Sequence, residues 1–237
     1  MGIGRVVAAT AIGITGLSLL TACGWANQSF SDSEDVTDSV TSVRFANDSG
    51  EITIRTGDET SVKRDVHYGG DKPGRTVKVE DGVLQLDACD KPDCSIDYEV
   101  TVPEGTKVTG ESDSGSIDIS GVAEATVKAS SGEVNVDDVA GEVKVEASSG
   151  SVDLTGIGGA VVAKADSGSV RVELSEPRDV RVDADSGSVE VTVPGGAYRV
   201  STSTDSGNVD SDVDDDSSGE HHLDLHTDSG NISVSQA

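Results

Sequence analysis

Apolar and polar residues alternate along most of the chain after residue 105. Typical stretches are residues 134–137, Val-Asn-Val-Asp, and residues 143–146, Val-Lys-Val-Glu, in which β-branched residues take the apolar positions. A period of two is typical of strands that bury one face, and β-branched residues favour strands. The pattern therefore predicts an all-β fold, with no helix after residue 23.

A Ser-Gly pair followed two residues later by Val or Ile recurs seven times from residue 114 onwards. The glycines are Gly115, Gly132, Gly150, Gly168, Gly187, Gly207 and Gly230, separated by 17, 18, 18, 19, 20 and 23 residues. An antiparallel meander would not need identical turns, whereas stacked coils place every turn above the last one. We therefore expect a parallel β-solenoid, a single-stranded and right-handed β-helix with repeats of about 18–20 residues.

Five of these turns carry an aspartate directly before the Ser-Gly pair. The first is Asp113, and the last four turns carry Asp166, Asp185, Asp205 and Asp228. Stacked coils lie about 4.8 Å apart, so these carboxylates should form a row along one edge. Like charges at this spacing repel one another. We expect the row to make stability depend on salt and to bind divalent cations weakly and without specificity.

Residues 1–23 have the pattern of a signal peptide. Arg5 precedes an apolar run at 6–20, which is too short for a membrane span of roughly 20 residues. The run ends in Leu-Thr-Ala-Cys and resembles the lipobox of bacterial lipoproteins. That resemblance implies a diacylglycerol on Cys23 and attachment to the extracytoplasmic face of the cell membrane. An ordinary secretory signal with a chance cysteine is the alternative.

The remaining chain divides into three parts. Residues 24–41, rich in Ser, Asp and Asn, are expected to form a flexible tether. Residues 42–105 follow a looser strand pattern and are interpreted as an N-terminal β region capping the repeats at 106–237. Cys89 and Cys94 form an even pair outside the cytosol, which predicts a disulfide loop. No second pair of Cys or His follows at the spacing of a zinc site.

The charge of the chain restricts its partners. Without residues 1–23, which contain Arg5 and no acid, 16 basic residues face 44 acidic ones, a net charge of −28. Nucleic acid and other phosphate-rich partners would be repelled, and no basic stripe is visible. Nucleic acid is therefore not expected as a partner.

The Cys89/Cys94 loop leads into Ser-Ile-Asp-Tyr-Glu-Val-Thr-Val-Pro and then into serial Asp-Ser-Gly-Ser-Val units. This arrangement resembles a bacterial family of candidate adhesins with β-strand repeats, a domain of unknown function. Within that family it is similar to lipoprotein members from Gram-positive actinobacteria. The resemblance covers residues 43–237 and implies a β-helical fold exposed outside the cytoplasm. The family carries no catalytic motif, and an acidic insertion at 210–218 departs from its pattern.

Two segments contain metal-ligating residue types. Alternating aspartates at 210–216 are similar to a calcium loop, but Asp215 stands where such a loop needs Gly and His221 where it needs Glu. In the segment His221–His226, strand alternation places His222, Asp224 and His226 on one face. These positions are about 7 Å apart, too far for one tetrahedral zinc ion. We predict neither a metal site nor a cofactor.

The sequence favours a non-enzymatic, lipid-anchored protein of the cell envelope, an adhesin or interaction scaffold whose partner is an envelope protein or a glycan. One alternative is an accessory of a cell-envelope stress or assembly system. A remote alternative is a polysaccharide-cleaving β-helix enzyme, because such enzymes use carboxylates. Here the carboxylates are spread over every coil, and no catalytic residue is predicted.

Overall fold

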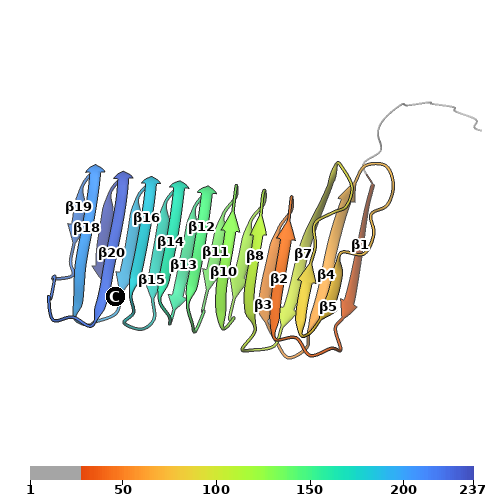
Figure 1. The fold of residues 1–237 in the computed structure, drawn as a ribbon, viewed down its shortest axis with the longest axis horizontal. Coiled ribbons are helices and arrows are strands. Elements are labelled where there is room, and N and C mark those ends of the chain that lie inside the picture. Colours follow the sequence, from red (N-terminus) through yellow and green to blue (C-terminus); the bar gives the residue numbers. More distant parts are fainter. Residues whose placement is uncertain (1–27) are drawn as a thin grey trace, which may run out of the picture.

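The computed structural model describes residues 28–237, which form two long β-sheets packed face to face in one elongated stack (Figure 1). These residues contain no helix, which confirms the predicted all-β class. Accordingly, nothing between Gln28 and Ala237 forms a helix long and apolar enough to cross a membrane. The predicted signal peptide and Cys23 lie outside the described residues.

Within residues 28–237 the first sheet has eleven strands, in the order β1 (Gln28–Asp35), β4 (Ser61–Tyr68), β7 (Cys94–Val102), β3 (Ile52–Thr56), β9 (Ile117–Ser120), β11 (Val134–Asp137), β13 (Val152–Ile157), β15 (Val170–Leu174), β17 (Val189–Val193), β21 (Ile232–Gln236) and β19 (Val209–Ser211). The second sheet has ten, in the order β18 (Tyr198–Ser206), β20 (His221–Ser229), β16 (Val180–Ser186), β14 (Val161–Ser167), β12 (Val143–Ser149), β10 (Glu124–Ala129), β8 (Lys107–Ser112), β2 (Ser42–Asn47), β6 (Val83–Leu86) and β5 (Val77–Glu80). The strands are parallel except where β4 pairs with β1 and β7, and where β5 pairs with β6.

Each coil consists of a strand in the second sheet, a Ser-Gly turn and a strand in the first sheet. In the central coils of the first sheet, parallel pairing joins residues 17, 18, 18 and 19 positions apart, starting from Ile117. Neighbouring coils therefore place equivalent residues side by side. This arrangement confirms the predicted parallel stack and excludes the meander.

The core is the narrow space between the two sheets. Inward positions carry mainly Val and Ala, and Val145 is 1% exposed while its neighbour Glu146 faces solvent. The predicted strand facing is therefore confirmed. One large ring in this space lies beside a glycine. Phe45 is buried against Gly110, where an added Cβ would lie 2.3 Å from the Phe45 ring.

The coils near the C-terminus are not stacked in chain order. The β20/β21 coil lies between the β16/β17 coil and the β18/β19 coil, so the last coil in sequence is not the last in space (Figure 1). Burial explains this order. Leu223 and Leu225 of β20 are buried, whereas Val200 and Thr202, opposite them on β18, are half-exposed at the open end. The more apolar coil thus occupies the internal position, where it is covered on both sides.

The N-terminal region differs from its predicted description in two respects. Residues 28–35 of the expected flexible tether form β1, which pairs antiparallel with β4 through all eight of its residues. The first coil, β2/β3, pairs directly with β8 and β9 and is continuous with the repeats. The cap is therefore smaller than residues 42–105 and consists of the outer strands β1, β4, β5, β6 and β7. A tight hairpin turn joins β5 and β6, with positive φ at Asp81 and Gly82.

Candidate functional site: the turn edge, the sheet faces and the disulfide cap

The Ser-Gly turns form one edge of the stack. Among the described residues, eight glycines lie in contact along it, in the order Gly50, Gly115, Gly132, Gly150, Gly168, Gly187, Gly230 and Gly207. Gly150 has a φ of +117°, and a Cβ added there would lie 1.8 Å from the carbonyl oxygen of Gly132. On the other side, the Gly150 amide donates to the Ser167 carbonyl at 3.1 Å. Glycine is needed both for its backbone conformation and for the close approach of adjacent turns.

The predicted row of aspartates lies along this edge, but the order of the aspartates in space differs from their order in the sequence. Ser186 pairs with Ser229, and Ser206 also pairs with Ser229. The contiguous order of the preceding carboxylates is therefore Asp166, Asp185, Asp228 and Asp205, all exposed to solvent. Asp205 is at the end of the row because its coil is the terminal one.

We expect the melting temperature to rise with moderate salt or millimolar calcium, because cations screen the repulsion between these carboxylates. Asp185→Asn with Asp228→Asn should remove much of this dependence by interrupting the row at its centre. The measurement is thermal unfolding followed by circular dichroism at several salt concentrations. Neutralising the exposed Asp58 and Asp81, which lie in other turns, is the matched control. An equal loss of salt dependence in the control would contradict a specific role for the row.

The outer face of the second sheet carries one row of alternating charge. The row crosses adjacent strands in register as Glu111, Lys128, Glu146, Lys164 and Asp183. The Lys128 Nζ lies 2.7 Å from the Glu146 carboxylate. This contact lowers the pKa of Glu146, with a smaller contribution from Lys164. Opposite charges on neighbouring strands support the register, although exposed pairs contribute little individually.

The outer face of the first sheet has a different charge. From β9 to β19, its strands contain six acidic residues and one basic residue, Arg171. The corresponding strands of the second sheet, β8 to β18, contain nine acidic residues but also six Lys or Arg residues. The basic residues of the repeats therefore gather on one face of an otherwise strongly acidic stack. A partner would meet two chemically distinct flat faces.

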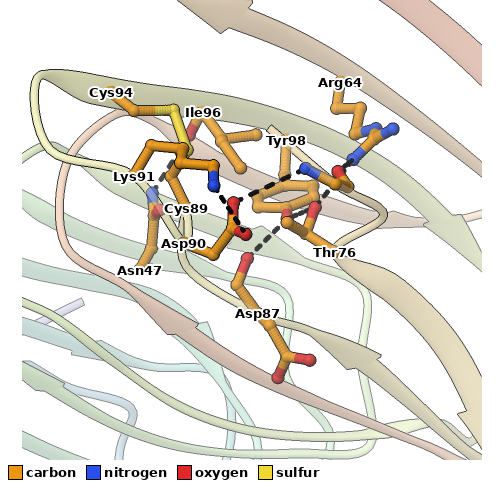
Figure 2. The surroundings of a disulfide bond; sticks show 11 residues. Asn47, Arg64, Thr76, Asp87, Cys89, Asp90, Lys91, Cys94, Ile96 and Tyr98 are labelled. Atoms are coloured by element: carbon orange, nitrogen blue, oxygen red, sulfur yellow. Dashed lines mark hydrogen bonds and ion pairs between the residues drawn. A yellow bond between two sulfur atoms is a disulfide. The ribbon is translucent and has the colours of Figure 1, made fainter. Parts of the chain in front are cut away.

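The disulfide lies in the cap at the other end of the stack. Cys89 and Cys94 are bonded, as predicted, with Cα atoms 6.0 Å apart, and they close the connection between β6 and β7 (Figure 2). Beside the loop, the Tyr98 hydroxyl donates to the Asp87 carbonyl at 2.7 Å and contacts the Thr76 hydroxyl. Burial raises the pKa of Tyr98 to about 12, so this phenol stays protonated at neutral pH.

A charged pair holds β1 to this cap. The guanidinium of Arg64 donates from Nε and Nη2 to the two carboxylate oxygens of Asp32, at 2.6 and 2.8 Å. The hydrogen bond from Arg64 lowers the pKa of Asp32. A lowered carboxyl pKa stabilises the folded state above the ordinary value near 3.8, and this contribution is lost as the pH falls through the folded value. Both residues line a cavity of about 290 Å³ together with Glu34 and Arg75.

Replacing Cys89 and Cys94 together by Ser should lower the free energy of unfolding by about 2 kcal/mol, the chain-entropy value for a loop this short. Urea denaturation followed by circular dichroism measures the loss. The repeats should keep their strand spectrum, because the disulfide is confined to the cap. A stability unchanged within error would contradict a structural role for the bond.

The ligand-type side chains of both metal candidates lie at the surface. Among the described residues, no group of three or more His, Cys, Asp or Glu side chains is placed to hold a metal ion. Asp216 instead accepts hydrogen bonds from the amide and hydroxyl of Ser218, which lower its pKa. His226 contacts Asp228 at 3.0 Å and the Ser203 hydroxyl at 2.9 Å.

Sequence reasoning missed two features of these surfaces. The charge row was detectable, because Lys128, Glu146 and Lys164 stand at equivalent repeat positions with alternating sign. The Asp32–Arg64 pair was not, because its partners are 32 residues apart in segments without a repeat.

The chain has two sheets of mainly parallel strands, joined in each coil by a Ser-Gly turn. This architecture is that of a stacked β-repeat protein. The family model described as Toastrack DUF4097 matches residues 76–235. The chain therefore belongs to this family, a bacterial domain of unknown function. No curated protein matches the sequence at a significant level.

Several solved structures are similar to the chain at low identity. A candidate adhesin from Bacteroides fragilis shares 13% identity with a TM-score of 0.43, over 90% of this chain and 99% of the other. A candidate adhesin from Parabacteroides distasonis has 13% identity and a TM-score of 0.39, over 90% and 98%. A candidate cell adhesion protein from Clostridium sporogenes has 11% identity and a TM-score of 0.36, over 90% and 100%.

Proposed function

We propose that this protein is a non-enzymatic scaffold of the cell envelope, anchored by lipid at Cys23 on the extracytoplasmic face of the membrane. The observation that carries the proposal is the register of the stack, which repeats outward polar side chains in straight rows across two flat faces. Such surfaces suit an extended protein or glycan partner that contacts several coils at once. We also propose that the coils wind in the right-handed direction, with a repeat of about 18–20 residues.

The position of β1 supports an anchored orientation. The described fold begins at Gln28, so only residues 24–27 separate it from Cys23. Four residues span at most about 14 Å when fully extended. Lipid on Cys23 would therefore hold the cap close to the membrane, with the β18/β19 coil at the opposite end of the stack (Figure 1).

Cys23→Ala should abolish lipidation, because the acceptor thiol is lost. Incorporation of labelled palmitate into the full-length protein measures this directly. The parent protein should be labelled and the variant unlabelled. A variant that is labelled as strongly as its parent would contradict the assignment of Cys23.

Photocrosslinking on intact cells tests which face is used. A crosslinking residue at position 144 samples the second sheet, and one at position 135 samples the first. Because basic side chains gather on the second sheet, we expect crosslinks to acidic or polar envelope partners mainly from position 144. Equal yields from both positions, or none from either, would contradict recognition by this face.

The accessory of an envelope stress or assembly system remains the second candidate. The cap, with its cavity lined by Asp32 and Arg64, favours it, because a membrane-proximal surface is placed to contact a membrane-embedded partner. A crosslinking residue at exposed position 71 should then capture one defined membrane protein.

A further inference from the structure

The outermost strand of the second sheet, β18, has one side that no other strand of residues 28–237 covers. Its inward residues show the consequence. Val200 and Thr202 are half-exposed, while Leu223 and Leu225, their partners on β20, are buried. An open edge of this kind presents unpaired backbone groups and can pair with a strand of another molecule.

The acidic segment, residues 212–218, lies over the first part of this open edge. The Asp215 carboxylate accepts a hydrogen bond from the Val200 amide at 3.0 Å, and the Asp216 amide donates to the Tyr198 carbonyl at 2.8 Å. Asp215 also forms an isolated parallel bridge with Tyr198. Ser218 donates to Asp216 through its amide at 2.9 Å and its hydroxyl at 2.6 Å, which fixes the turn that follows. The insertion thus acts as a partial strand partner.

The rest of the edge stays available for pairing. In a strand, the amide and carbonyl of alternate residues point to the same side. Because the Val200 amide and the Tyr198 carbonyl face the acidic segment, the backbone groups of Thr202 and Thr204 also point to the open side. The contacts of the acidic segment with the open side of β18 end at Val200.

The sequence of β18 is complementary to itself in the antiparallel direction. If two copies of β18 pair around Thr202, Val200 lies opposite Thr204 of the second copy. Arg199 then lies opposite Asp205, so the outward face gains two opposite-charge pairs. At present the Arg199 Nε donates to the Gly219 carbonyl at 2.9 Å, beside the acidic segment. The acidic segment and the adjacent Gly219 therefore already bind the backbone groups of Tyr198 and Val200 and the Arg199 guanidinium, which this pairing would need.

We propose that the acidic segment is a guard that keeps β18 from pairing with the β18 of a second copy of this chain. It acts by covering the edge at Tyr198–Val200 and by charge. Residues 210–220 contain six acidic residues and no basic one, so two such ends repel each other. Covering an edge strand with a loop and placing charge beside it are established ways of preventing sheet-to-sheet association.

The test replaces residues 212–218 by a Gly-Ser linker of the same length in the full-length chain. Sedimentation equilibrium in density-matched detergent should find a monomer for the parent and a species of twice that mass for the variant. Adding Thr202→Pro, which removes an amide on the open side, should restore the monomer. Asp212→Asn with Asp214→Asn keeps the hydrogen bonds to the edge and leaves four of the six acidic residues of 210–220, so this control should stay monomeric. A folded linker variant that remains monomeric, or a dimer that survives Thr202→Pro, would overturn the proposal.

Hydrogen exchange on the parent protein gives an independent test that does not depend on the linker variant folding. The Val200 amide should exchange about tenfold more slowly than the Thr202 amide, because Asp215 accepts its hydrogen bond. Asp215→Ala should remove this difference and leave the Val182 amide, inside the sheet, unchanged. A Val200 amide that exchanges as fast as Thr202 in the parent would show that the guard does not cover the edge.

Discussion

We expect Gly150→Ala to lower the free energy of unfolding by about 4 kcal/mol, a large part of the 5–15 kcal/mol typical of a folded domain. Gly150 has a φ of +117°, which L-residues with a Cβ rarely adopt. The new methyl group would also lie 1.8 Å from the Gly132 carbonyl oxygen, a backbone atom. The turns must then move apart, and the hydrogen bond from the Gly150 amide to Ser167 is strained as well. Urea denaturation followed by circular dichroism measures the loss.

Two other glycines separate the causes. Gly105→Ala introduces the backbone strain alone, because Gly105 has a φ of +82° and its added Cβ meets nothing within 4 Å. This change should cost about 1 kcal/mol. Gly74→Ala has neither strain nor contact and should be nearly neutral. If Gly150→Ala cost no more than Gly105→Ala, close stacking of the turns would not contribute to stability.

Val145→Asp should unfold the central coils. Val145 is 1% exposed and lies opposite Val127 and Ala163 in the adjacent strands. A carboxylate there has no hydrogen-bond donor among apolar neighbours, and an unpaired buried charge costs several kcal/mol. Because neighbouring coils share their strand pairing, the loss should extend beyond one coil. Loss of the strand signal in circular dichroism at 25 °C would be the expected result.

Glu146→Asp is the matched control one residue away. Glu146 is exposed on the outer face and pairs with Lys128, so shortening its side chain should change stability by less than about 0.5 kcal/mol. Similar effects of the two substitutions would be incompatible with the alternating burial of β12.

The repeating unit could be predicted from the sequence because its signals are local. Alternation in residues such as 143–147 identifies a strand and its buried face, and a recurring Ser-Gly identifies the turn. Identical turns are required only where coils stack on one another, so the sequence also predicts that neighbouring coils pair in parallel. The Cys89–Cys94 bond was predictable for the same reason, because its partners are five residues apart. The row of aspartates was predictable from the turns, but the order of the aspartates along the row was not.

The tertiary structure alone decided how the ends of the stack are arranged. Every Ser-Gly turn looks alike in sequence, so the turn pattern does not say that Gly230 lies between Gly187 and Gly207. The choice depends on which coil gains more by being covered on both sides, and Leu223 and Leu225 gain more than Val200 and Thr202. The tertiary structure also decided the conformation of β1. Its polar sequence is typical of a linker, and its pairing with β4 depends on contacts distant in sequence, such as that of Asp32 with Arg64. Local sequence thus determined the coil and its turns, whereas competition for burial and long-range pairing decided the order of the coils and the surfaces at both ends.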